Sequence, residues 1–122
     1  MTNDQIGWVV EVSVNAGRLA PWNDLMHEMV ASTRAEPGTL TYEWMLGADG
    51  SRCQIFERYA SVAAALIHAR AFDAKFAKRF LALASPKALS VYGTPDAELR
   101  AWFAPSSPRY FSPIGGFDRT KG

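Results

Sequence analysis

The sequence predicts an α+β domain of the ferredoxin-like class, with two helices packed on one face of an antiparallel sheet. Two observations predict it. Apolar residues alternate at every second position in four segments, and they recur with a helical period in two others. These segments follow one another as strand, helix, strand, strand, helix, strand, which is the split βαβ arrangement.

The first strand and the first helix are predicted from their residue types and from the turn, proline and glycine residues at their ends. IGWVVEVSV, Ile6 to Val14, is rich in β-branched residues and is followed by the turn sequence Asn-Ala-Gly. Pro21 suits the first turn of a helix, and apolar residues recur at helical spacing from there to about Arg34. The Pro37-Gly38 pair then ends the helix.

A hairpin and a second helix are predicted next. TLTYEWML (residues 39–46) and RCQIFERYA (52–60) read as strands, and GADGS between them supplies turn residues. Ser61 is a candidate N-cap, and the apolar period continues behind it as far as Leu83. We therefore expect one long helix, bent near residues 71–73.

The C-terminal part is predicted as a fourth strand over Lys87 to Gly93, a short helix in DAELRAWFA and an irregular tail from Pro105. The tail is too apolar to be fully solvated, so Tyr110 to Phe117 is expected to dock on a sheet edge or on another protomer. A chain of 122 residues suits one domain, 1–122, with a core of about 5–95 and the short helix and tail in 96–122.

Composition excludes several classes of function. Thirteen Lys and Arg against twelve Asp and Glu give a formal charge of +1. This charge provides no positive electrostatic field that would attract nucleic acid. The N-terminal residues lack the features of a signal peptide, and no membrane association is indicated, so a cytoplasmic protein is expected. Cys53 is the single cysteine, and we find neither metal-ligand spacing nor a dinucleotide glycine motif. No metal and no cofactor is expected.

The predicted sheet is apolar on both faces. In the first strand, Trp8 and Val10 point to one side and Val9 points to the other; in the third strand, Phe56 lies opposite Ile55. Large exposed apolar surfaces on monomers usually mark association. We therefore expect a homodimer formed through the sheet faces.

Two stretches resemble the antibiotic biosynthesis monooxygenase family: EPGTLTYEWML at Glu36 to Leu46, and IFERYASVAAALIHA at Ile55 to Ala69. The resemblance implies a dimeric α+β barrel with a cavity between sheet and helices in each protomer. Similar proteins include oxygenases that oxidise phenolic or quinol-like molecules without metal or flavin, heme-degrading monooxygenases, and isomerases of small molecules. The heme-degrading relatives carry a Trp where His68 stands and a His about three turns later, where this chain has KFAKRF, so heme ligation is not expected.

His68 and Glu57 are the candidate catalytic residues. His68 lies about 100° from the centre of the apolar stripe of its helix, on a flank from which it could reach a cavity mouth. A satisfied or solvated histidine is the alternative. Glu57 lies in the middle of the third strand, where a carboxylate either pairs with a cation or faces a cavity. The resemblance implies a Glu at this position, and both a base and a structural anchor stay open.

Six further residues are candidates for substrate binding: Trp8, Tyr42, Trp44, Tyr59, Phe72 and Arg79. The aromatic side chains could stack on an aromatic substrate, or they could pack in the core or a dimer interface. Arg79 and Lys75 share the flank of His68, where they could hold an anionic group or solubilise the helix. Because neighbours alternate along a strand, Tyr42 and Trp44 share a face that Glu43 does not.

Two functions are therefore predicted. The first is a cofactor-independent monooxygenase that oxidises a small phenolic or quinol-type aromatic molecule with dioxygen, with Glu57 or His68 as the base. The alternative is a noncatalytic ligand-binding or dimerisation module, or a small-molecule isomerase. An open cavity of roughly 300 Å³ or more, reached by His68 or Glu57, would favour the enzyme.

Overall fold

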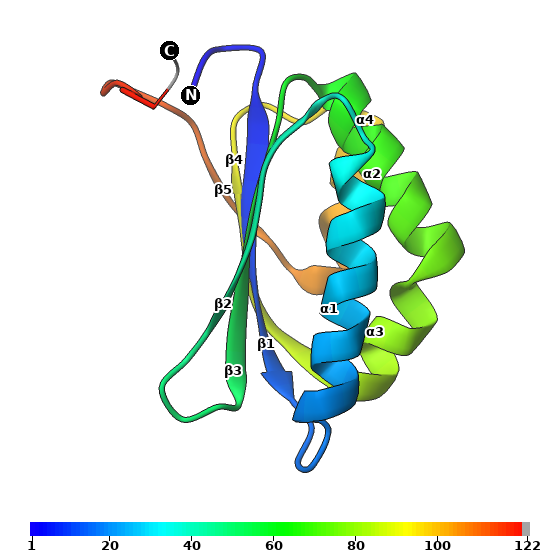
Figure 1. The fold of residues 1–122 in the computed structure, drawn as a ribbon. Helices are drawn as coiled ribbons and strands as arrows, with labels where there is room; N and C mark the ends of the chain where they lie inside the picture. The colour runs from blue at the N-terminus through cyan, green and yellow to red at the C-terminus, as the bar shows by residue number, and fades with distance from the viewer. Residues whose placement is uncertain (121–122) are drawn as a thin grey trace.

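Strand β1 (Ile6–Val14) lies in the interior of a five-stranded sheet, and the helices pack on one side of that sheet (Figure 1). The computed structural model describes residues 1–120. The other elements are α1 (Leu19–Arg34), β2 (Thr39–Leu46), β3 (Arg52–Tyr59), α2 (Val62–Lys75), α3 (Ala77–Leu83), β4 (Ala84–Tyr92), α4 (Ala97–Phe103), the 3-10 helix η1 (Ala104–Ser106) and β5 (Arg109–Phe111).

The sheet has the strand order β2-β3-β1-β4-β5. The first four strands pair antiparallel, as in the split βαβ arrangement, and β5 adds a parallel pair at the edge of β4. The ferredoxin-like α+β class predicted from the sequence is confirmed, and β5 makes the sheet mixed. No helix within residues 1–120 is both long enough and apolar enough to cross a lipid bilayer.

The predicted long second helix is divided into α2 and α3. The break is at Phe76, whose backbone angles (φ −128°, ψ −22°) leave the helical range, and not at residues 71–73. The apolar period runs on through Phe76, so the pattern gave no sign of the break. Beyond it, Phe80 enters the core and its ring lies 5.0 Å from that of Trp22 and 5.3 Å from that of Phe72.

The last two strands also differ from the prediction. Strand β4 begins at Ala84, three residues before the predicted start, and runs through Pro86. A register shift opposite Glu11 and Val12 accommodates this proline, which cannot donate to a regular ladder. In the tail, which was predicted as irregular, β5 pairs with β4, and the Phe111 ring stacks on Tyr92 at 5.6 Å. Backbone pairing at a sheet edge thus anchors this part of the tail.

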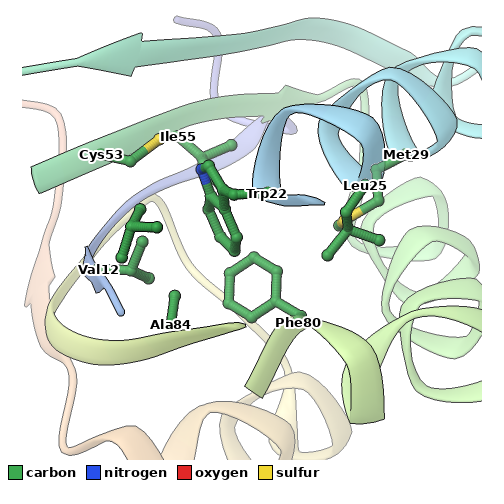
Figure 2. Packing of buried hydrophobic residues seen from close by; sticks show 9 residues of the cluster. Val12, Trp22, Leu25, Met29, Cys53, Ile55, Phe80 and Ala84 are labelled. Atoms are coloured by element: carbon green, nitrogen blue, oxygen red, sulfur yellow. The ribbon is translucent and has the colours of Figure 1, made fainter. Parts of the chain in front are cut away.

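Buried apolar side chains form two clusters between the sheet and the helices. Figure 2 shows the first, in which Trp22 of α1 lies between strand residues such as Ile55 and Phe80 of α3. The second lies beneath α2 and α4 and is built from Ile6, Trp8, Tyr59, Ala65, Leu89, Val91, Leu99 and Phe103. Both clusters contribute to the walls of the cavity described below.

Gly38 lets α2 approach the start of β2. A Cβ atom at this position would lie 2.5 Å from the Cβ atom of Ala64, and the Gly38 carbonyl accepts a hydrogen bond from the Ala60 N–H at 2.9 Å. The Pro-Gly pair therefore does more than end α1, because its glycine makes room for the helix that carries His68.

We expect Gly38→Ala to destabilise the protein by about 1–3 kcal/mol, because the added methyl group forces α2 away from the sheet. Urea unfolding measures this. Gly115→Ala is the matched control, since a Cβ atom there meets nothing within 4 Å. Equal unfolding free energies for the two variants would contradict the close approach.

Candidate functional site

His68 lies between two glutamates in a buried cluster. Its Nδ1 is 3.0 Å from Oε1 of Glu36, and its Nε2 is 3.3 Å from Oε1 of Glu57. The His68 residue is 5% exposed. A neutral imidazole has one N–H, whereas the protonated ring has two and can donate to both carboxylates. The geometry therefore favours the imidazolium form.

The surroundings of His68 act on its pKa in opposite directions. Burial lowers the pKa, but the hydrogen bond to Glu57 and the negative charges of Glu57 and Glu36 outweigh burial and raise the pKa above 6.5. This direction agrees with the geometry, which favours the protonated ring. In that form it orients both carboxylates but has no lone pair with which to accept a proton.

The local sequence explains how these groups meet. Glu36 follows the last turn of α1, directly before the helix-ending proline, and accepts a hydrogen bond from Oγ1 of Thr39 at 2.9 Å. Glu57 points to the helix side of β3, and His68 lies in the middle of α2. The cluster therefore ties the segment before β2 to β3 and to α2.

Two tyrosines flank this cluster. The Tyr59 hydroxyl, fully buried, donates to Oε1 of Glu57 at 2.6 Å. Burial, followed by the charge of Glu57, raises the pKa values of Tyr59 and Tyr42. Both phenols therefore stay neutral, and the Tyr42 ring lies 5.3 Å from the ring of His68.

A cavity of about 390 Å³ opens between the sheet and α2, α3 and α4. Glu57, His68 and Asp73 are its charged wall residues, and among residues 1–120 no Lys or Arg lines it. The rest of the wall is largely apolar and aromatic, including Trp8, Val10, Met29, Tyr42, Ile55, Phe72, Phe80, Leu89, Trp102 and Phe103. Such a lining, with a few polar groups, is typical of small-molecule sites.

The structure brings most of the predicted site residues together. Both candidate catalytic residues, Glu57 and His68, line the cavity, and so do Trp8, Tyr42 and Phe72. Their roles in catalysis and substrate binding stay predictions. Tyr42 and Trp44 lie on the same side of the sheet, as alternation predicted, and the structure shows that this is the helix side. Glu43 is exposed on the other side.

Three predicted substrate-binding residues lie off the cavity wall. Tyr59 is buried and reaches the site through its bond to Glu57. Trp44 packs against Trp22, with ring centroids 5.2 Å apart. Arg79 is exposed and forms an ion pair with Glu28 of α1. Its neighbour on the same flank, Lys75, donates to Oγ of Ser32 at 2.8 Å. Lys75 and Arg79 therefore contact α1, whereas His68 lines the cavity, so the three side chains do not share one face as predicted.

Sequence reasoning missed three residues of the site: Glu36, Asp73 and Trp102. Glu36 stands in the EPG stretch, which predicts the end of a helix and carries the family resemblance, but nothing in that stretch places Glu36 beside His68. Trp102 donates from Nε1 to both carboxylate oxygens of Asp73, at 3.1 Å and 3.0 Å. This contact joins residues 29 positions apart, and no local pattern signals it.

In the described part of the chain, no group of three or more His, Cys, Asp or Glu side chains is arranged to hold a metal ion. Both ring nitrogens of His68 are instead engaged by carboxylates. The atom left for chemistry is a carboxylate oxygen. Both contacts of Glu57 described above use Oε1, and within residues 1–120 its Oε2 has no hydrogen-bond partner, so this oxygen can accept a proton.

Comparisons with solved structures support the fold. The chain is similar to MupZ from Pseudomonas fluorescens (22% identity, TM-score 0.84, 96% of each chain covered). It is also similar to a conserved protein from Methanosarcina mazei Go1 (16% identity, TM-score 0.65, covering 75% of this chain and 94% of that one). A third similar structure is a variant of SnoaB, described as a cofactor-independent oxygenase from Streptomyces nogalater (14% identity, TM-score 0.62, covering 77% of this chain and 96% of that one).

A search of curated proteins gives no match. Residues 6–79, however, match the model of a family described as antibiotic biosynthesis monooxygenase. This match covers more than half of the chain and includes Glu36, Glu57 and His68. The chain therefore belongs to the antibiotic biosynthesis monooxygenase family.

Proposed function

We propose that the protein is a cofactor-independent monooxygenase that oxidises a small phenolic or quinol-type aromatic molecule with dioxygen. The observation that carries this proposal is the position of Glu57, a buried carboxylate on the wall of an aromatic cavity of about 390 Å³. The volume exceeds the roughly 300 Å³ at which ligand pockets begin. Membership of the family supports the same reaction class.

In this proposal Glu57 is the base. Its Oε1 is engaged by Tyr59 and His68, which leaves Oε2 to accept the proton of a substrate hydroxyl. His68, held as a cation, is a positioning residue that fixes the carboxylate and balances its charge. The choice that the sequence left open between Glu57 and His68 thus narrows to Glu57.

The reaction then needs no further cofactor. Proton loss to Glu57 leaves an electron-rich anion, which transfers one electron to dioxygen, and the resulting radical pair combines to form a carbon–oxygen bond. The peroxide takes up a proton and loses water to give a quinone carbonyl. For an anthrone, a CH₂ group and O₂ become a C=O group and H₂O, so the substrate supplies all the electrons. The protein places the ring and excludes bulk water.

A noncatalytic ligand-binding module is the second candidate. The observation that favours it is that the polar atoms of the cluster already have partners within the protein. Both nitrogens of His68 and one oxygen of Glu57 are engaged in this way. Buried polar networks of this kind also occur as purely structural elements. An isomerase would use the same base without dioxygen, so turnover with and without oxygen separates the three.

We expect chelator-treated protein to consume oxygen and form quinone absorbance with members of a panel of anthrones and hydroquinones. Glu57→Gln should lower kcat by about 10²- to 10⁴-fold, because an amide cannot accept the proton. Glu28→Gln, the same change on the exposed face of α1, is the control and should match the wild type. If folded protein neither consumes oxygen nor alters any spectrum, the proposal is wrong; turnover that needs no oxygen would indicate an isomerase.

We expect Glu36→Gln to lower the pKa of His68, because one of the two negative charges that raise it is removed. NMR titration of the imidazole signals measures this, with His27→Gln used to assign the signal of the other histidine. The substitution should also shift the pH dependence of turnover to lower pH. An unchanged titration midpoint of His68 would mean that Glu36 does not stabilise the protonated form of His68.

We further propose that the protein forms a homodimer through the outer face of the sheet. Phe56, Met45 and Tyr92 on this face are 37%, 48% and 36% exposed. Analytical sedimentation should give the mass of two chains for the wild type and of one chain for Phe56→Lys. Ile67→Lys, on the outward side of α2, is the control and should leave the mass unchanged. A wild type that sediments as a single chain would contradict the dimer.

A further inference from the structure

One wall of the cavity comes from a segment that follows the family match. The match ends at residue 79, whereas Trp102 and Phe103 of α4 and Pro105 and Ser106 of η1 all line the cavity. The proton-accepting cluster lies inside the matched part. The residues that form this wall can therefore differ in sequence while Glu57 and His68 stay the same.

Trp102 is held in that wall by both polar and aromatic contacts. Its Nε1 donates to both oxygens of Asp73 on α2, and its ring lies 5.8 Å from Trp8, 6.2 Å from Phe72 and 5.3 Å from Phe103. A polar anchor at one end and aromatic contacts around the ring leave the indole little freedom. It forms a flat, fixed surface.

A second contact joins the same two helices but lies away from the cavity. Arg70 of α2 and Glu98 of α4 form an ion pair at 2.8 Å, with side chains that are 63% and 59% exposed. Exposed ion pairs of this kind contribute little to stability. The orientation of Trp102 therefore depends on its bonds to Asp73 and on the rings around it, and little on this ion pair.

The charges on the cavity wall disfavour anionic ligands. Glu57 and Asp73 bring negative charge, and the cation His68 is already committed to two carboxylates. None of the lining residues in the described chain is Lys or Arg. A carboxylate, sulfonate or phosphate on the ligand would be desolvated beside these groups with no cation to pair with.

The volume of the cavity suits more than one ring. A cavity of roughly 150 Å³ is enough for benzene, and this cavity measures about 390 Å³. A single phenol would leave much of the aromatic wall without contact. A flat fused-ring molecule could reach from Glu57 to Trp102.

We propose that Trp102, held by Asp73 and the surrounding rings, is the specificity-determining residue of this site and selects flat fused-ring phenols over single-ring ones, while the charges of the cavity wall exclude anionic ones. This inference rests on the proposed function, because it assigns the substrate class of the same cavity. Glu57 acts on the hydroxyl, Trp102 sets the size of the ring system, and the negative charges of Glu57 and Asp73 exclude anions.

The test is anaerobic binding, measured by calorimetry, with three probes: 1,8-dihydroxyanthraquinone, anthraquinone-2-sulfonate and hydroquinone. The wild type should bind the uncharged tricycle at least ~10-fold more tightly than either of the others. Trp102→Ala should weaken binding of the tricycle by about 10-fold, which corresponds to an aromatic contact of about 1.4 kcal/mol. Its effect on hydroquinone should be smaller than about 3-fold.

Trp102→Phe keeps an aromatic ring but removes the bond to Asp73, so an intermediate loss of about 3-fold is expected. This variant decides the matter if Trp102→Ala does not fold. Arg70→Gln is the matched control, since it breaks the other contact between α2 and α4 and should bind all three probes as the wild type does.

Two results would overturn the inference: folded Trp102 variants that bind all three probes with wild-type affinity, or a wild type that prefers the sulfonate. Selective binding that is lost in the Trp102 variants supports the inference even if no oxygen is consumed. In that case the monooxygenase proposal fails and the role of Trp102 stands, because binding is measured without turnover.

Discussion

The contact of His68 with two glutamates is the interaction on which the rest of the site depends. It joins α2 to a residue 32 positions earlier and to a strand in the interior of the sheet. Without a cation between them, Glu36 and Glu57 would be two carboxylates in a buried place, each with an unmet demand for donors. With the imidazolium in place, each receives a charge-assisted hydrogen bond. The helix is thereby fixed to the sheet at the edge of the cavity.

This constraint also explains the packing around the cluster. A distance of 3.0 Å between His68 and Glu36 requires that α2 approach the start of β2 closely, and Gly38 provides the space beside Ala64. Behind the cluster, Tyr59 supplies a further donor to Glu57. The side chains around a largely apolar cavity of about 390 Å³ lack the packing contacts that they would make in a filled core. A rigid polar frame on one side and interlocking aromatic rings on the other keep such a cavity from collapsing.

Much of the fold and part of the site could be predicted from the sequence. The bounds of β1 and the shared side of Tyr42 and Trp44 followed from alternation, because every second side chain of a strand points the same way; which face of the sheet this side is did not follow. Alternation could not show that Tyr42 reaches the cavity while Trp44 packs against Trp22, since that depends on where the helices cross the sheet. The role of Glu36 was missed for a similar reason, and so was the strand form of β5, although docking of the tail on a sheet edge was predicted. The first is a contact between distant segments, and the second uses backbone groups that any sequence supplies.

The site divides into two parts that differ in origin. The groups suited to proton transfer lie within residues 6–79, the span that matches the family, and Trp102 lies in the segment after it. Helix α2 connects the two parts, because it carries His68 and, five residues later, Asp73. A shift of this helix would move the cation that orients Glu57 and the carboxylate that holds Trp102 together. The geometry of the base and the shape of the opposite wall are therefore coupled through one helix, although Glu57 and Trp102 lie far apart in the sequence.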